Sequence, residues 1–398
     1  MKGRSKSSRS RRAGPAVASE HLPSQAQLRR IAARVLALSE ADETEVTIEA
    51  ESDALTRFAN NVIHQHVAEQ GLVISIRAVV DGRTARATTN KNDQESLRRA
   101  AQAAFELARH QPKHPDLLPM ARPPARGAAT SVRRYFEATA AATPADRARV
   151  VAKLCDAARR GGHTAAGIFS TGASAMLLAN SRGVFAFHSQ TRAEFSITAM
   201  DGDSSGWAKA TSPDLGGIEP QALARRAMEK AVLSRQPREI PPARMTVILE
   251  PAAVLDLVGF LFYDFAGTAV LDHRSCFNER IGKQVFDANI HLSDDVYHPL
   301  QSGAPFDGEG LPRQRVRLVE AGVPKHLVYS RATAKKMKEK PTGHGLPLPN
   351  EWGEAPMNLV LEGGDSSVEA MIASTDRGVL LTRVWYVREV DPYEKVLT

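Results

Sequence analysis

A chain of 398 residues is longer than one ordinary hydrophobic core supports, so the sequence predicts at least two domains. Its hydrophobic fraction of 42% and charged fraction of 24% are typical of a globular protein. No apolar run approaches the roughly 20 residues that a membrane-spanning helix needs. No apolar segment follows the N-terminus as it would in a signal peptide. We therefore expect a cytoplasmic protein without a membrane segment.

The net charge of +7 comes almost entirely from the N-terminus. Without the Lys and Arg residues of the first twelve positions, the rest of the chain carries about +1. We expect residues 1–22 to be a disordered basic tail that contacts nucleic acid only weakly. Cys155 and Cys276 are the only cysteines and are far apart, which predicts no disulfide framework and fits a reducing compartment. The basic residues of the tail are Lys2, Arg4, Lys6, Arg9, Arg11 and Arg12.

Residues 23–110 predict a first module of one helix, several strands and a second helix. Apolar residues recur at helical spacing over residues 25–38, after Ser24 as N-cap. Strands are predicted around residues 46–50 and over residues 72–80. Asp81-Gly82 predicts a two-residue hairpin turn into a strand over residues 83–89. Asp93 then caps a helix that is expected to end near residue 109.

A proline-rich connection leads to a second module, residues 140–236, in which the same order returns. Thr143-Pro144 predicts a helix start, with Asp146 as the acid of a capping box. Strands are expected between residues 165 and 211, with a turn at residues 180–183, and a helix over residues 221–234. The repeated order of helix, strands and helix suggests a structural duplication within one N-terminal α/β domain, residues 23–238.

After a boundary at residues 236–244, residues 245–398 predict a β-rich C-terminal domain that resembles a sandwich or a barrel. A strand is expected over residues 245–250, and an apolar helix from Pro251 to about residue 265. The fold class is therefore α+β. Further strands are predicted at residues 285–292, 315–319, 327–329, 358–361 and 379–390.

The usual catalytic and metal-binding motifs are missing from the sequence. None of the twelve histidines is followed by Glu at either of the next two positions, so no HExxH zinc helix is present. His110 and His114 have ligand-like spacing, but prolines interrupt the helix that would bring them together. No phosphate-binding glycine loop, dinucleotide fingerprint or nucleophile elbow occurs. The residues by themselves predict no catalytic residue and no metal ligand.

Six segments taken together resemble a known family, and their order along the chain matches it. The resemblance runs from about Ser24 to the end of the chain and is to the TldD/PmbA family, the so-called modulators of DNA gyrase. The segments are TRFANNVIH at residues 56–64, ANSRG at 179–183, RSCFNERIGKQV at 274–285, FDGEG at 306–310, KPTGH at 340–344 and TDRGVLLTRVWY at 375–386.

The resemblance implies an N-terminal α/β region, a β-rich C-terminal domain, and a metallopeptidase made of two related subunits that acts on unfolded or modified peptides. The TldD-type subunit binds zinc through HExxxH, and the PmbA (TldE) type lacks this motif. An ungapped count from residues 280–285 places the motif at residues 258–263, where this chain has VGFLFY. Among these six residues only Tyr263 could bind zinc, and it would be a marginal ligand. The chain therefore resembles the PmbA type, without zinc of its own and with a TldD-type HExxxH partner.

The chain departs from the family pattern at both ends. The family usually continues beyond Thr398 with a glycine-rich strand segment, which in the TldD type includes a cysteine that binds zinc. We therefore expect the C-terminal domain to be truncated at its end. The basic tail is not a family feature.

The first hypothesis is a non-catalytic peptidase subunit that binds an extended peptide by strand addition. Residues 379–390 could supply the sheet edge, and Arg383, Trp385 and Tyr386 could line the binding chamber, together with Tyr263 and His344. Two alternatives stay open. One is an autonomous zinc peptidase whose divergent site would use scattered histidines, such as His273, His298 and His344. The other is a nucleic-acid or regulatory binding protein.

Overall fold

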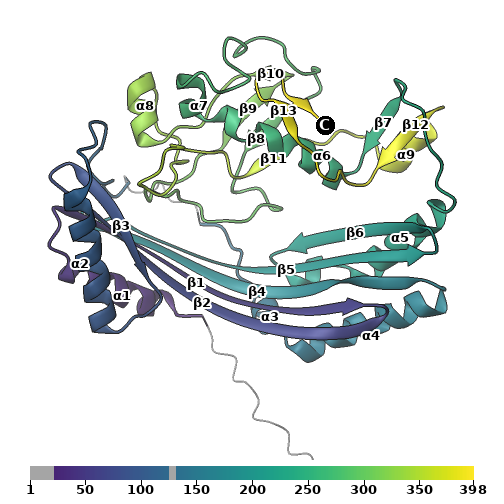
Figure 1. The fold of residues 1–398 in the computed structure, drawn as a ribbon, viewed down its shortest axis with the longest axis horizontal. Helices are drawn as coiled ribbons and strands as arrows, with labels where there is room; N and C mark the ends of the chain where they lie inside the picture. The colour runs from purple at the N-terminus through teal and green to yellow at the C-terminus, as the bar shows by residue number, and fades with distance from the viewer. Residues whose placement is uncertain (1–21, 125–130) are drawn as a thin grey trace, which may run out of the picture.

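A computed structural model describes residues 22–124 and 131–398 (Figure 1). Nearly all of the predicted basic tail, residues 1–21, lies outside the described residues. Within them, no helix is long and apolar enough to cross a membrane. Cys155 and Cys276 are both free and buried, in agreement with the prediction of no disulfide framework.

The first module begins and turns at the predicted residues. Ser24 forms a capping box with Gln27 at the start of the first helix. Asp81 and Gly82 both have positive φ, at 49° and 72°, as a two-residue hairpin turn requires. The strands extend further than predicted. The elements are α1 (Gln25–Leu38), β1 (Glu43–Ala59), β2 (Val62–Val80), β3 (Arg83–Thr89) and α2 (Gln94–His110).

The second module repeats this order after a short helix, α3 (Glu137–Ala140). Thr143 caps its long helix through the backbone N–H of Asp146, and the Asp146 carboxylate accepts from the Thr143 N–H at 3.0 Å. The remaining elements are α4 (Pro144–Arg160), β4 (Thr164–Asn180), β5 (Phe185–Asp201), β6 (Ser204–Ser212), the 3-10 turn η1 (Leu215–Gly217) and α5 (Pro220–Leu233).

The two modules share one antiparallel sheet with the strand order β3-β2-β1-β4-β5-β6. The first strand of each module forms the seam, which runs from the pair Glu45–Asn180 to the pair Phe58–Gly167. The order is symmetric about this seam, as the predicted duplication requires. Each module has its own buried core, one around α1 and α2 and one around α4 and α5. In Figure 1, α1, α2 and α4 lie on one side of the sheet and the C-terminal part lies on the other.

The C-terminal part is a set of small sheets and short helices around Phe265, Phe277, Leu318 and Val328. Its strands form a four-stranded sheet, β10-β9-β8-β11, and two two-stranded sheets, β12-β7 and β13-β14. The α+β class is confirmed, and the described strands form open sheets and not a closed barrel. The strands are β7 (Thr246–Leu249), β8 (Leu292–Asp294), β9 (Val316–Glu320), β10 (Val323–Pro324), β11 (Leu359–Leu361), β12 (Gly378–Leu381), β13 (Glu389–Asp391) and β14 (Val396–Leu397). The helices are α6 (Pro251–Val258), α7 (Gly267–Leu271), α8 (Arg331–Met337) and α9 (Val368–Ala373), with 3-10 turns η2 (Gly259–Leu261) and η3 (Tyr263–Phe265).

Several predicted elements of this part are wrong in extent. The helix predicted to residue 265 ends at Val258, where Gly259 follows and the chain continues as two 3-10 turns. Residues 285–291 and 327–329 form no strand, although Val328 makes a single bridge to Ala266. The strand predicted over residues 379–390 is two short strands separated by residues 382–388.

Buried contacts fix the C-terminal part on the sheet. Leu178 and Val184 of the second module pack against Phe306. The loop beside Phe306 approaches so closely that a Cβ on Gly310, at φ 81°, would lie 2.6 Å from the Val184 side chain. Arg134 is 2% exposed and donates hydrogen bonds to the carbonyls of Val296, Gly303 and His298.

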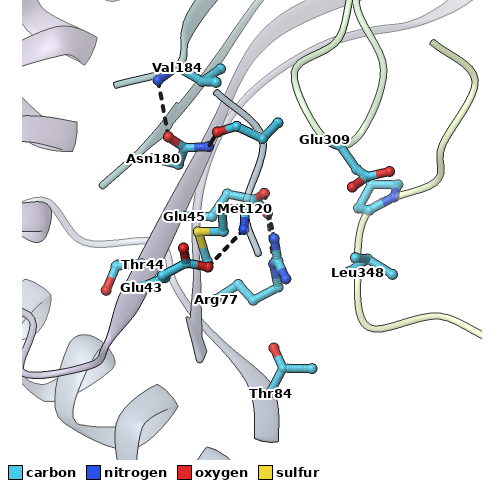
Figure 2. A network of polar contacts seen from close by, with 12 residues as sticks. Glu43, Thr44, Glu45, Arg77, Thr84, Met120, Asn180, Val184, Glu309 and Leu348 are labelled. Atoms are coloured by element: carbon cyan, nitrogen blue, oxygen red, sulfur yellow. Dashed lines mark hydrogen bonds and ion pairs between the residues drawn. The ribbon is translucent and has the colours of Figure 1, made fainter. Parts of the chain in front are cut away.

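A buried ion pair lies on the same side of the sheet (Figure 2). Arg77 on β2 and Glu45 on β1 face each other across the two strands. Arg86 on β3 bonds both Glu45, at 2.7 Å, and the Leu348 carbonyl of the C-terminal part, at 2.6 Å. Arg86 therefore links the buried Glu45 carboxylate of the N-terminal sheet to the C-terminal part.

Candidate functional site

The C-terminal part contains a cavity of about 670 Å³ with several aromatic side chains in its wall. Three segments far apart in the sequence form it: the end of α6 with η2 and η3, the loops around Arg274 and Trp352, and the β13–β14 hairpin. We call it the aromatic pocket. Its lining residues are Asp256, Gly259, Phe260, Phe262, Tyr263, Asp264, Arg274, Trp352, Glu389, Pro392, Tyr393 and Lys395.

The pocket wall is shaped where α6 ends. Pro251 at the first turn starts this apolar helix, and the 3-10 turns after Gly259 present Phe262 and Tyr263 at the surface. The buried carboxylate of Asp264 anchors the last turn, because it accepts from the Cys276 backbone N–H at 2.7 Å. Ser275 donates to the Asp264 carbonyl, also at 2.7 Å. These bonds fix the aromatic turn on the segment 275–276.

Lys395 of the β13–β14 hairpin lines the pocket. Its ammonium lies 2.6 Å from the Asp264 carboxylate, 2.7 Å from that of Glu389 and 3.3 Å from the Phe260 carbonyl. Burial lowers the pKa of Lys395, but the two carboxylates outweigh burial and hold that pKa above its usual value. Lys395 is therefore charged at neutral pH and shared between two carboxylates.

The neighbouring Cys276 thiol is in an environment that disfavours its nucleophilic, ionised form. Burial, with the Asp264 charge as second cause, raises the pKa of Cys276 to about 12. The thiolate required for nucleophilic attack is thus strongly disfavoured at neutral pH. Although His273 lies three residues before Cys276, the pair therefore lacks the thiolate that a cysteine protease needs.

An aromatic pair and a guanidinium form part of the pocket wall. The rings of Tyr263 and Trp352 meet edge to face with centroids 4.8 Å apart. The guanidinium of Arg274 lies over both rings, 5.5 Å from the Tyr263 centroid and 6.0 Å from the Trp352 centroid. It also donates to the Tyr263 hydroxyl at 3.1 Å and to Asp272 at 2.9 Å. Burial raises the pKa of Tyr263, so its hydroxyl is protonated.

One of the predicted peptide-binding residues lines this pocket, and two lie on the segment that precedes its residue Glu389. Tyr263 is in its wall. Trp385 and Tyr386 are 79% and 70% exposed on the segment that leads to Glu389. The Val384 backbone N–H fixes this segment by donating to Asp256 at 2.8 Å. The peptide-binding role of all three stays a prediction.

Arg383 and His344 lie elsewhere. The Arg383 guanidinium is 4.7 Å from the ring centroid of Trp207 on β6, so it contacts the N-terminal sheet. His344 is fully buried, and its Nε2 lies 2.8 Å from the Asp294 carboxylate while its Nδ1 lies 2.9 Å from the Thr342 hydroxyl. A buried ring offers a peptide no surface in this conformation, so we do not include His344 in the pocket.

Family models match most of the chain in three consecutive pieces. The PmbA/TldA metallopeptidase domain 1 matches residues 44–108, the central domain residues 130–235 and the C-terminal domain residues 242–397. The chain belongs to the PmbA/TldD family.

Curated relatives in this family share limited identity. A metalloprotease of Methanothermobacter thermautotrophicus is 26% identical over 219 residues, 51% of this chain and 47% of the relative. Metalloprotease PmbA of Escherichia coli O157:H7 is 23% identical over 308 residues, 73% of this chain and 64% of that protein. The alignments with the archaeal metalloproteases span about half or less of those relatives.

Solved structures show the same fold. TldE from Thermococcus kodakarensis superposes with a TM-score of 0.78 at 21% identity, over 89% of this chain and 82% of that one. A Thermotoga maritima protein described as a modulator of a DNA gyrase gives a TM-score of 0.79 at 20% identity, over 91% of this chain and 83% of the other.

The PmbA/TldD name raises the question of whether zinc fits this chain. Residues 258–263 place a valine, a glycine, a leucine, two phenylalanines and Tyr263 where the family count expects HExxxH, and α6 ends at the first of them. These side chains offer no imidazole and no carboxylate. In residues 22–124 and 131–398, no three His, Cys, Asp or Glu side chains are grouped as metal ligands. A zinc ion does not fit the residues present there.

Sequence reasoning missed Trp352, Lys395, Asp264 and Glu389. Trp352 had no periodic pattern around it, and a lone aromatic residue in a loop carries no signal of its neighbours. The contact of Lys395 with Asp264 joins residues that are distant in the sequence. Only Asp264 had a local signal, because it directly follows Tyr263, which was a predicted peptide-binding residue.

Proposed function

We propose that this chain is a PmbA/TldE-like subunit of a two-component metallopeptidase. It binds extended, unfolded or modified peptides and leaves the zinc chemistry to a TldD-type partner with HExxxH. The observation that carries the proposal is the aromatic pocket, which lies where the family expects zinc ligands but has rings and no ligand set. The proposed complex would act in proteolysis or peptide maturation in the cytoplasm.

The backbone of the peptide would pair with a sheet edge. In the described residues, β12 has only β7 as a neighbouring strand, which leaves its other edge for strand addition. After Leu381 the chain passes Trp385 and Tyr386 and reaches Glu389 in the pocket wall. A peptide paired along β12 would therefore be guided toward the aromatic pocket.

Zinc content and activity test the proposal together. The purified chain should contain far less than one zinc per molecule by elemental analysis and cleave no unfolded peptide alone. Co-expression with a TldD-type HExxxH subunit should give a stable complex with peptidase activity. One tightly bound zinc per chain, lost on mutation of His273, His298 and His344, together with cleavage by the chain alone, would establish the autonomous peptidase instead.

The salt dependence of DNA binding tests the alternative of a nucleic-acid-binding protein. Because the basic charge is concentrated in residues 1–12, deleting them should abolish any salt-sensitive DNA binding. Strong, salt-sensitive binding by the shortened chain would show that the folded body itself binds nucleic acid.

A further inference from the structure

We propose that the aromatic pocket accepts the positively charged side chain of a lysine or arginine in the bound peptide. This inference rests on the proposed peptide-binding function and names the side chain that the site selects. The pocket volume of about 670 Å³ lies within the range of roughly 300–1,000 Å³ that is typical of ligand sites. Its charges and its rings both favour a cation.

Carboxylates outnumber cations in and around the pocket. Asp264 and Glu389 share the single ammonium of Lys395. In the described part of the chain, Asp256 forms no ion pair, and its carboxylate accepts from the Val384 N–H. Arg274 is the second cation, and Asp272 compensates it at 2.9 Å. The pocket therefore has net negative charge, which attracts a cationic side chain.

The ring faces are suited to a cation. Phe262, Trp352 and Tyr393 are 43%, 56% and 52% exposed, so much of their apolar surface is open to a ligand. The negative face of an aromatic ring attracts ammonium and guanidinium groups. Arg274 already stacks over Tyr263 and Trp352 within this wall, which shows that the rings hold a guanidinium of the protein itself.

Other occupants fit less well. An anionic side chain would meet Asp256, Asp264 and Glu389, and the Lys395 ammonium already contacts two carboxylates. An uncharged apolar side chain would gain contact with the rings but would cover the Asp256 carboxylate without compensating its charge. A lysine or arginine satisfies both requirements, since its methylene chain packs on the rings while its charged end reaches a carboxylate.

Matched peptides test this selection. The probes are acetylated, amidated heptapeptides of alanine and serine whose central residue is lysine, norleucine or glutamate. Binding to the full chain is measured by titration calorimetry at low and high salt, with tryptophan fluorescence as a second signal. We expect the lysine peptide to bind roughly tenfold more tightly than the norleucine peptide at low salt. This preference should shrink as salt rises.

Two variants test whether the preference for lysine arises in the aromatic pocket. Asp256→Asn keeps an acceptor for the Val384 N–H and removes one charge, and we expect it to reduce the lysine preference to about threefold. Trp352→Leu removes an exposed ring and should reduce it similarly. Glu229→Gln is the matched control, because it removes one exposed carboxylate from α5, which contributes nothing to the pocket. It should leave the preference unchanged.

Each result is decisive. Equal binding of the three peptides would overturn the inference but leave peptide binding intact. A lysine preference that neither Asp256→Asn nor Trp352→Leu alters would place the recognition elsewhere and also overturn it. Failure of every peptide to bind would overturn the proposed function as well.

Discussion

Arg77 donates two hydrogen bonds to the Glu45 carboxylate, at 3.2 and 3.0 Å, and the two side chains are only 2% and 1% exposed. The pair begins a series of polar contacts that ends at the Leu348 carbonyl of the C-terminal part, because Arg86 bonds both Glu45 and Leu348. Removing Arg77 would take away two hydrogen bonds of the Glu45 carboxylate and leave Arg86 as its cation, which is costly in a low-dielectric interior.

Arg77→Ala should therefore lower the free energy of unfolding by about 3 kcal/mol, measured by urea denaturation. The matched control is Arg98→Ala, which removes an arginine paired with Glu95 on the surface of α2, where the side chains are 55% and 60% exposed. The control should change stability by less than about 0.5 kcal/mol. Equal changes in the free energy of unfolding would show that the buried pair stabilises the protein no more than the exposed pair does.

Arg134→Ala should loosen the C-terminal part from the sheet. Three carbonyls of the segment 296–303 lose their donor, and we expect a loss of about 3 kcal/mol in stability, with faster hydrogen exchange confined to that segment. Arg133→Ala is the neighbouring control, since this exposed arginine stacks on Phe136 and, within the described residues, forms no hydrogen bond or ion pair with the segment. Unchanged exchange in Arg134→Ala would contradict the assigned role.

His188→Gln should remove a dependence of stability on pH. Burial, with Arg134 as the second cause, lowers the pKa of His188 from 6.5 to about 4. Between these values the unfolded chain binds a proton that the folded chain does not, so the original protein loses stability as pH falls from 6.5 toward 4. At pH 5 this loss should amount to about 2 kcal/mol.

The measurement for His188 is the difference in unfolding free energy between the two proteins at pH 7.5 and pH 5. Other titrating groups cancel in this difference, including Asp307, whose pKa burial raises to about 7. A difference that stays constant with pH would mean that the ring is protonated inside the fold.

Both thiols should resist modification in the native protein. Burial raises the pKa of Cys155, and that of Cys276 reaches about 12. A disulfide reagent at pH 8 should therefore label neither within minutes, and label two thiols per chain after denaturation. Rapid labelling of one native thiol would show that its side chain is accessible and ionised.

Local signals predicted the N-terminal domain well. The capping boxes at Ser24 and Thr143 and the turn at Asp81 and Gly82 act within a few residues. Apolar patterns located part of β1 and the second half of β2 but not the full length of either strand. The duplicated order also followed from the sequence, because each module repeats the same local signals.

The C-terminal part and the pocket depend on contacts that local patterns do not encode. Strands such as β8 and β11 are three residues long and are stabilised by neighbouring strands that are distant in sequence. The strand conformation predicted over residues 285–291 and 382–388 is absent from the described structure. Tyr263 was predicted through the family count. Its contacts with Trp352 and Arg274 come from tertiary folding alone.

The symmetric sheet has a consequence for the order of folding. Within each module, neighbouring strands are joined by tight turns, so β1-β2-β3 and β4-β5-β6 can each form from contacts near in sequence. The seam between β1 and β4 joins residues separated by more than a hundred positions, such as Glu45 and Asn180. Closing such a long loop is slow. The first meander can therefore assemble while the chain is still being synthesised, and it then presents β1 as the template on which the second meander docks.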